Sequence, residues 1–186
     1  MKKGGYLWTG VWAVVMLGLT AAGCAPVQVA APQPTDAIQQ IRSALDLPQS
    51  PLVFVENTTM VNSPGGDLLT ANFRDGEGRV YSVDLATNTV VEIDARAMLA
   101  NISPAAPVLA PDQIKARVMR YVKAVMPDFD PVQSALQYEE GGKVGNYFFA
   151  WRAEAEPGAM NGPWLQIGMH QSGVLFAYIN TLGVVP

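Results

Sequence analysis

Two proline-rich segments divide this chain and limit what it can fold into. Residues 25–34 read APVQVAAPQP, and residues 101–111 read NISPAAPVLAP. Proline breaks the interior of a helix and removes a hydrogen-bond donor from a central strand, so neither segment suits a long helix or a sheet interior. The sequence therefore predicts a tether over residues 24–34, a folded module over 35–100, a linker over 101–110 and a second module over 111–186.

Each predicted module begins with a short amphipathic helix. In the first, Thr35 is expected as the N-cap, and apolar residues from Ile38 to Leu45 form one stripe before Pro48 stops the helix. In the second, Pro111 suits the first helical position and Pro127 ends the helix. Its apolar stripe consists of Ile114, Val118, Tyr121, Val122 and Val125.

Four strands are expected after each helix, because β-branched and aromatic runs alternate with turn residues such as Gly141-Gly142. We therefore predict an α+β fold of two tandem repeats, each with one helix packed on a four-stranded antiparallel sheet. The expected strands cover residues 52–61, 68–74, 79–85 and 90–94, and then 134–140, 146–155, 164–170 and 174–181.

The N-terminal segment has the pattern of an export signal. Lys2 and Lys3 precede an uncharged, largely apolar stretch over residues 4–23, which ends in small residues before Cys24. This ending resembles the lipobox of bacterial lipoproteins. The resemblance implies cleavage after residue 23 and acylation of Cys24, so that the acylated cysteine holds the protein on a membrane.

An uncleaved apolar anchor and plain secretion are the alternatives, since roughly 17–25 apolar residues suffice to span a bilayer. All three place the folded part outside the cytoplasm. With acylation, the expected location is the extracytoplasmic face of the cell membrane or the outer membrane.

Two hairpin-like segments carry a further resemblance. Residues 80–94, VYSVDLATNTVVEID, resemble the closing hairpin of PepSY domains, with Asn88-Thr89 at the turn in place of the usual Thr-Gly. Residues 148–152, FFAWR, and residues 167–180 resemble the neighbouring YcdB/YcdC repeat family. The resemblance implies a small α+β module of cell-envelope proteins that binds or restrains peptidases and carries no catalytic residues of its own.

Composition excludes several kinds of site. With one cysteine and one histidine, the chain cannot form an internal disulfide, a cysteine zinc site or a multi-histidine metal site. The net charge of −4 has the wrong sign for binding nucleic acid. No metal, cofactor or nucleic-acid partner is therefore expected.

The residues that resemble catalytic or calcium-binding groups have simpler interpretations. His170 and Ser172 would need Asp84 or Asp94 to complete a triad, but no nucleophile motif surrounds the serine, and we interpret the pair as a strand end and a turn. The carboxylates at 75–77 and 128–130 lack the ligand spacing of an EF-hand loop and are interpreted as acidic turns.

Two sets of side chains are candidates for contact with partners. The cations Lys115, Arg117, Arg120 and Lys123 are interpreted as a solvated helix flank, with anionic lipid headgroups as the alternative. The aromatic residues are expected mainly in the core, and they are also the candidate partner surface: Tyr147, Phe149, Trp151 and Trp164.

These observations favour a non-enzymatic, membrane-anchored module that binds a peptidase or another envelope protein. A sensor that holds a small ligand in a groove between the two modules is the alternative. A hydrolase is the third possibility, although a single histidine leaves little from which to build its site.

Overall fold

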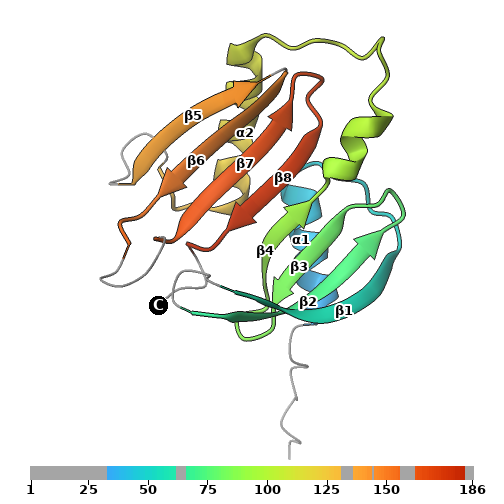
Figure 1. The fold of residues 1–186 in the computed structure, drawn as a ribbon, viewed down its shortest axis with the longest axis vertical. Coiled ribbons are helices and arrows are strands. Elements are labelled where there is room, and N and C mark those ends of the chain that lie inside the picture. The colour runs from blue at the N-terminus through green and yellow to red at the C-terminus, as the bar shows by residue number, and fades with distance from the viewer. Residues whose placement is uncertain (1–32, 62–65, 131–135, 144, 156–161, 183–186) are drawn as a thin grey trace, which may run out of the picture. The chain divides into compact units, whose positions relative to one another are not determined.

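The computed structural model describes residues 33–61, 66–130, 136–143, 145–155 and 162–182 (Figure 1). The predicted acylation site, Cys24, lies outside these residues. The helical elements are α1 (Pro34–Ala44), a 3₁₀ helix η1 (Arg96–Asn101) and α2 (Pro111–Val125). The strands are β1 (Leu52–Met60), β2 (Leu68–Asp75), β3 (Val80–Asp84), β4 (Thr89–Asp94), β5 (Gln137–Lys143), β6 (Asn146–Arg152), β7 (Trp164–His170) and β8 (Leu175–Asn180).

All eight strands belong to one antiparallel sheet, in the order β1-β2-β3-β4-β8-β7-β6-β5. Strand β4 pairs with β8, with Glu92 opposite Ile179 and Asp94 opposite Ala177. The prediction of two repeats, each with its own four-stranded sheet, is therefore wrong. Two separate sheets would expose four unpaired edges, and the pairing of β4 with β8 covers two of them.

The described residues contain only three helical elements against eight strands. Helices α1 and α2 cover the same face of the sheet (Figure 1). One continuous core lies beneath them, to which both helices contribute fully buried side chains, such as Ile38 from α1 and Val118 from α2. The apolar stripes predicted from helical periodicity point into this core. The strands supply the other side of the core through Tyr81, Val83, Ile93, Phe149, Trp151, Leu165, Ile167 and Tyr178.

The two long helices begin in similar ways. Helix α1 starts at Pro34, so Thr35 is inside the first turn and the prediction of Thr35 as N-cap is wrong. The Asp36 carboxylate accepts a hydrogen bond of 3.2 Å from the amide of Gln33. Helix α2 has Pro111 at its first position, as predicted.

The hairpin turns confirm one sequence inference and correct another. Asn88 in the β3–β4 turn has φ +54°, in keeping with the tolerance of asparagine for positive φ. Gly141 and Gly142 are inside β5, opposite Phe148 and Tyr147, and do not form the expected turn. The turn between β5 and β6 instead uses Gly145, whose φ is +77°.

Candidate functional site

The predicted aromatic partner surface is largely inside the core. Phe149 and Trp151 are fully buried, and Trp151 packs edge-on against Phe129 at a centroid distance of 6.2 Å. Tyr147 and Trp164 are half-buried. The main expectation, that these aromatic residues lie in the core, is therefore correct for Phe149 and Trp151, whereas their alternative role as a partner surface is wrong because both side chains are buried.

The opposite face of the sheet carries the aromatic residues that alternate with this buried series along the strands, such as Phe148 and Trp164. Phe148 is 38% exposed and lies edge-on to Phe176, with 5.1 Å between ring centroids. The guanidinium of Arg152 stacks over Trp164 at 3.9 Å. The alternation of side chains along β6 could have indicated this surface. If Phe149 and Trp151 point into the core, then Phe148 and Arg152, on either side of them, point to the other face.

Strand β1 forms one edge of the sheet and exposes a run of apolar side chains. Val53, Phe54 and Val55 are 65%, 54% and 42% exposed. The register of β1 on β2 shifts between Phe54 and Glu56, and this β-bulge leaves Val55 outside the regular pairing. No strand pairs with the outer side of β1 among the described residues, so part of its backbone hydrogen-bonding capacity faces outward.

The other edge, β5, is protected against further pairing. Its sequence QYEEGGK contains three charged residues, and two of them are held in ion pairs. Glu140 binds Lys115 at 2.8 Å, and Glu139 binds Arg152 at 3.3 Å. By contrast, Glu56 is the one charged residue in the nine residues of β1. Natural sheets use charges to block edge pairing, so β1 is the edge that is chemically open to another strand.

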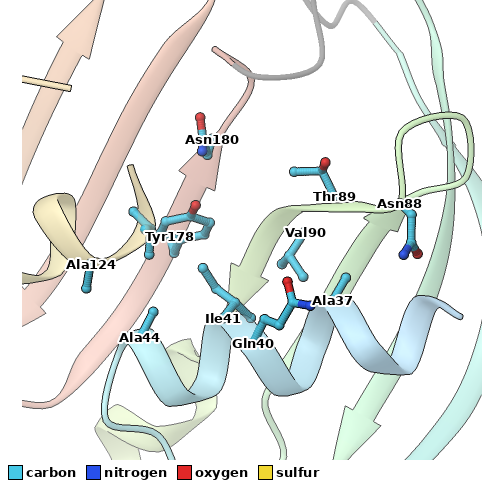
Figure 2. A pocket seen from close by; sticks show the side chains of 11 residues that line it. Ala37, Gln40, Ile41, Ala44, Asn88, Thr89, Val90, Ala124, Tyr178 and Asn180 are labelled. Carbon is cyan, nitrogen blue, oxygen red and sulfur yellow. The ribbon is translucent and has the colours of Figure 1, made fainter. Parts of the chain in front are cut away.

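A groove of about 240 Å³ lies between α1 and α2, above the junction of β4 and β8. Figure 2 shows α1 along one side, with Val90 of β4 and Tyr178 of β8 opposite. Small side chains leave the space between the helices, namely Ala37, Ala44 and Ala124. The groove is at the position where the sequence-based alternative placed a small-ligand site.

Hydrogen-bonding side chains surround this groove. Gln40, Asn88, Thr89 and Asn180 line it together with the buried phenol of Tyr178 (Figure 2). Burial raises the pKa of Tyr178 well above its usual value, and the hydrogen bond with Asn180 offsets only part of this effect. The phenol is therefore neutral at physiological pH. The groove offers amide and hydroxyl groups and no charged side chain among its described lining residues.

His170 and Ser172 contact each other, but neither Asp84 nor Asp94 joins them in a triad, in keeping with the interpretation of the pair as a strand end and a turn. His170 Nδ1 lies 2.8 Å from Ser172 Oγ and also accepts the Ser172 amide at 3.1 Å. Asp84 binds the hydroxyl of Thr87 at 2.6 Å, and Asp94 binds Arg96 at 2.6 Å. Each candidate carboxylate is thus held within its own strand end or turn, and the histidine–serine contact closes the β7–β8 turn.

Asp75 has a structural role that the sequence did not reveal. Its Oδ1 accepts the amides of Glu77 at 3.0 Å and Arg79 at 2.9 Å, while its Oδ2 binds three side chains. These contacts occupy the carboxylate that was considered for calcium. Among the described residues, no group of three or more histidine, cysteine, aspartate or glutamate side chains is arranged to hold a metal ion.

The cations of α2 connect this helix to other parts of the domain. Lys115 pairs with Glu140 of β5, and Arg120 pairs with Asp46, which follows α1, at 3.0 Å. Arg117 donates a hydrogen bond of 3.1 Å to the carbonyl of Gly173. Lys123 is exposed. The flank predicted to be simply solvated therefore makes three specific contacts.

Comparisons of the whole chain with protein-family models, with curated proteins and with solved structures find no match. Within the part of the chain that the structure describes, no helix has both the length and the apolar character needed to cross a membrane.

Proposed function

We propose that the protein is a membrane-tethered binding module on the extracytoplasmic side of the cell envelope. In this proposal, an extended segment of a partner polypeptide adds to the sheet at strand β1. The observation that carries the proposal is the run of three exposed apolar side chains, Val53 to Val55, on an edge with which no other described strand pairs. Strand addition uses main-chain hydrogen bonds for affinity and the side chains along the edge for specificity.

The proposed partner is a secreted or envelope peptidase. The resemblance of residues 80–94 to PepSY domains supports this choice, and the export-signal pattern before Cys24 supports the location. The proposed role is restraint of the peptidase by binding. It requires no catalytic group in this chain, in keeping with the dispersed positions of His170, Asp84 and Asp94.

The experiment compares two exposed valines. A photo-activatable residue is placed at Val53 or at Val108, which is 71% exposed and lies outside the sheet, in full-length protein in native membranes. We expect a partner cross-linked from position 53 but not from position 108. That partner is then purified, and its binding is measured to Val53→Lys and Val108→Lys in detergent micelles.

The expected result is at least about tenfold weaker binding for Val53→Lys, because a lysine on the edge opposes strand pairing, with no change for Val108→Lys. If the partner is a peptidase, its turnover should fall as the binding protein saturates it. Equal cross-linking from both positions, or equal affinities of the two lysine variants, would rule out the β1 edge.

A second candidate function is the binding of a small polar ligand in the groove of Figure 2. The presence of Gln40, Asn88 and Asn180 among the residues that line a space bordered by alanines favours it. Its test is a thermal-shift screen of amino acids, sugars and nucleosides against the full chain. A ligand of the groove should lose its effect in Ala44→Leu and keep it in Ala116→Leu, a control at an exposed position of α2.

A further inference from the structure

A second cavity, of about 300 Å³, lies where α2 faces the segment after α1 and the β7–β8 turn. Three arginines line it, namely Arg79, Arg117 and Arg120, and Asp46 is the one carboxylate among the described residues that line it. The chain as a whole has a net charge of −4, so this concentration of positive charge runs against the overall composition.

The fold explains how the three cations meet. Arg117 and Arg120 are three residues apart on α2, so they share one flank of the helix. Arg79 immediately precedes β3 and is only 6% exposed, and its guanidinium is fixed by Asp75 at 3.1 Å and Glu77 at 2.7 Å. Apolar walls, including Leu47 and Leu175, strengthen the field of these charges within the cavity.

The arginines retain hydrogen-bonding capacity for a ligand. The bond from Arg117 to the Gly173 carbonyl is its one hydrogen bond in the described part of the chain, whereas a guanidinium has five N–H donors. Arg120 is paired with Asp46, but both side chains of this pair are 64% exposed. Exposed ion pairs are weak, so an anion can replace Asp46 as the partner of Arg120.

We propose that this cavity binds a phosphate group. Arg117 and Arg120 would hold its oxygens, because planar guanidinium groups match phosphate with paired hydrogen bonds, and Arg79, whose charge is balanced by Asp75 and Glu77, would form part of the cavity wall. The same chemistry serves free inorganic phosphate and the phosphodiester of an anionic lipid headgroup. This proposal does not depend on strand addition at β1, because no residue of β1 lines the cavity.

The test is isothermal titration of full-length protein in non-ionic detergent micelles with inorganic phosphate, at constant ionic strength set by chloride. We expect saturable binding that weakens at least about tenfold in Arg117→Gln and in Arg120→Gln, since hydrogen bonds between charged groups are lost. Asp46→Asn should bind more tightly than the unmodified protein, because it removes the competing carboxylate. Lys123→Gln makes the same change of charge on the same helix outside the cavity and should bind normally.

A second arm separates the two sources of phosphate. Mixed micelles of the same detergent with phosphatidylglycerol, and mixed micelles with phosphatidylcholine, are added as competitors to the phosphate titration. Competition by the phosphatidylglycerol micelles alone assigns the site to a headgroup, and no competition assigns it to the free anion. The proposal is overturned if phosphate does not bind saturably, if Lys123→Gln weakens binding as much as Arg117→Gln does, or if Asp46→Asn does not tighten it.

Discussion

Arg42 of α1 and Asp75 at the end of β2 form a buried ion pair, with 3.4 Å between Nη2 and Oδ2. The same carboxylate oxygen accepts Arg79 Nη1 at 3.1 Å and the hydroxyl of Tyr81 at 3.0 Å. The guanidinium of Arg42 also lies over the Tyr81 ring, 4.7 Å from its centroid. One carboxylate thus links a helix to two strands in the interior of the protein.

The first prediction concerns this carboxylate. Asp75→Asn should lower the free energy of unfolding by about 3–5 kcal/mol at pH 7, because it leaves Arg42 and Arg79 buried with too little negative charge. Urea unfolding measures this loss. Asp112→Asn, at an exposed site in the first turn of α2, is the control and should cost less than about 1 kcal/mol.

The carboxyl group of Asp75 should also make the stability of the fold depend on pH in acid. Burial raises the pKa of Asp75, but hydrogen bonds from Arg79, Tyr81 and the Glu77 amide outweigh it, so the folded-state pKa is below the ordinary 3.8. A depressed carboxyl pKa stabilises the fold above the unfolded value, and this stabilisation is lost as the pH falls through the folded value. The urea concentration at the unfolding midpoint should therefore decrease as the pH falls below about 4 in the unmodified protein, and it should decrease less steeply in Asp75→Asn. Identical acid profiles would contradict this assignment.

A second pH effect is expected in base. Burial raises the pKa of Tyr81 to about 12, and it also raises that of Tyr178. The folded state prefers both phenols protonated, so their contribution to stability is complete below pH 10 and is lost as the pH rises from about 10 toward 12. Ultraviolet absorbance should show tyrosinate forming together with unfolding. Ionisation of all tyrosines near pH 10 in a protein that stays folded would contradict the prediction.

Gly168 is expected to be intolerant of a side chain. A Cβ atom at this position would lie 2.8 Å from two carbons of the Phe176 ring, so Gly168→Ala should destabilise the fold by about 1–3 kcal/mol. Gly141→Ala is the matched control, since no atom lies within 4 Å of its Cβ position, and it should be neutral or stabilising. Chemical denaturation compares them. Phe176→Leu in the Gly168→Ala background should recover part of the loss if the ring is the cause.

The lipid anchor is tested by Cys24→Ser. If Cys24 is acylated, serine at this position lacks the thiol that carries the acyl group. The variant should then leave the membrane fraction or accumulate as an unprocessed precursor. Fractionation and intact-mass measurement of the purified chain decide the matter. An unchanged mature mass and unchanged fractionation would contradict acylation, and an uncleaved anchor would keep residues 1–23 in the measured mass.

Local signals in the sequence predicted local structure. The apolar stripes of both helices and the first position of α2 at Pro111 follow from periodicity and proline geometry, and the positive φ of Asn88 follows from turn chemistry. The pairing of β4 with β8 has no such signal, since alternation along a strand is the same whether its edge is open or paired.

The candidate sites depend on contacts between distant segments, and this limits their prediction. Asp75 looked like part of an acidic turn because Arg42, which comes from another element, gives no local pattern. Alternation grouped Phe149 with Trp151, and the expectation that these aromatic residues lie mainly in the core is correct for both. The cavity proposed to bind phosphate combines Arg79, which precedes β3, with Arg117 and Arg120 from α2. The sequence showed Arg117 and Arg120 only as members of a cationic helix flank.

Strand β8, the partner of β4, comes after all the other described strands in the sequence. Until β8 has been synthesised, the edge of β4 that faces away from β3 has no partner in this sheet. Exposed strand edges favour aggregation. Completion of the sheet therefore waits for β8, and the first four strands must avoid pairing with other chains until that strand is available.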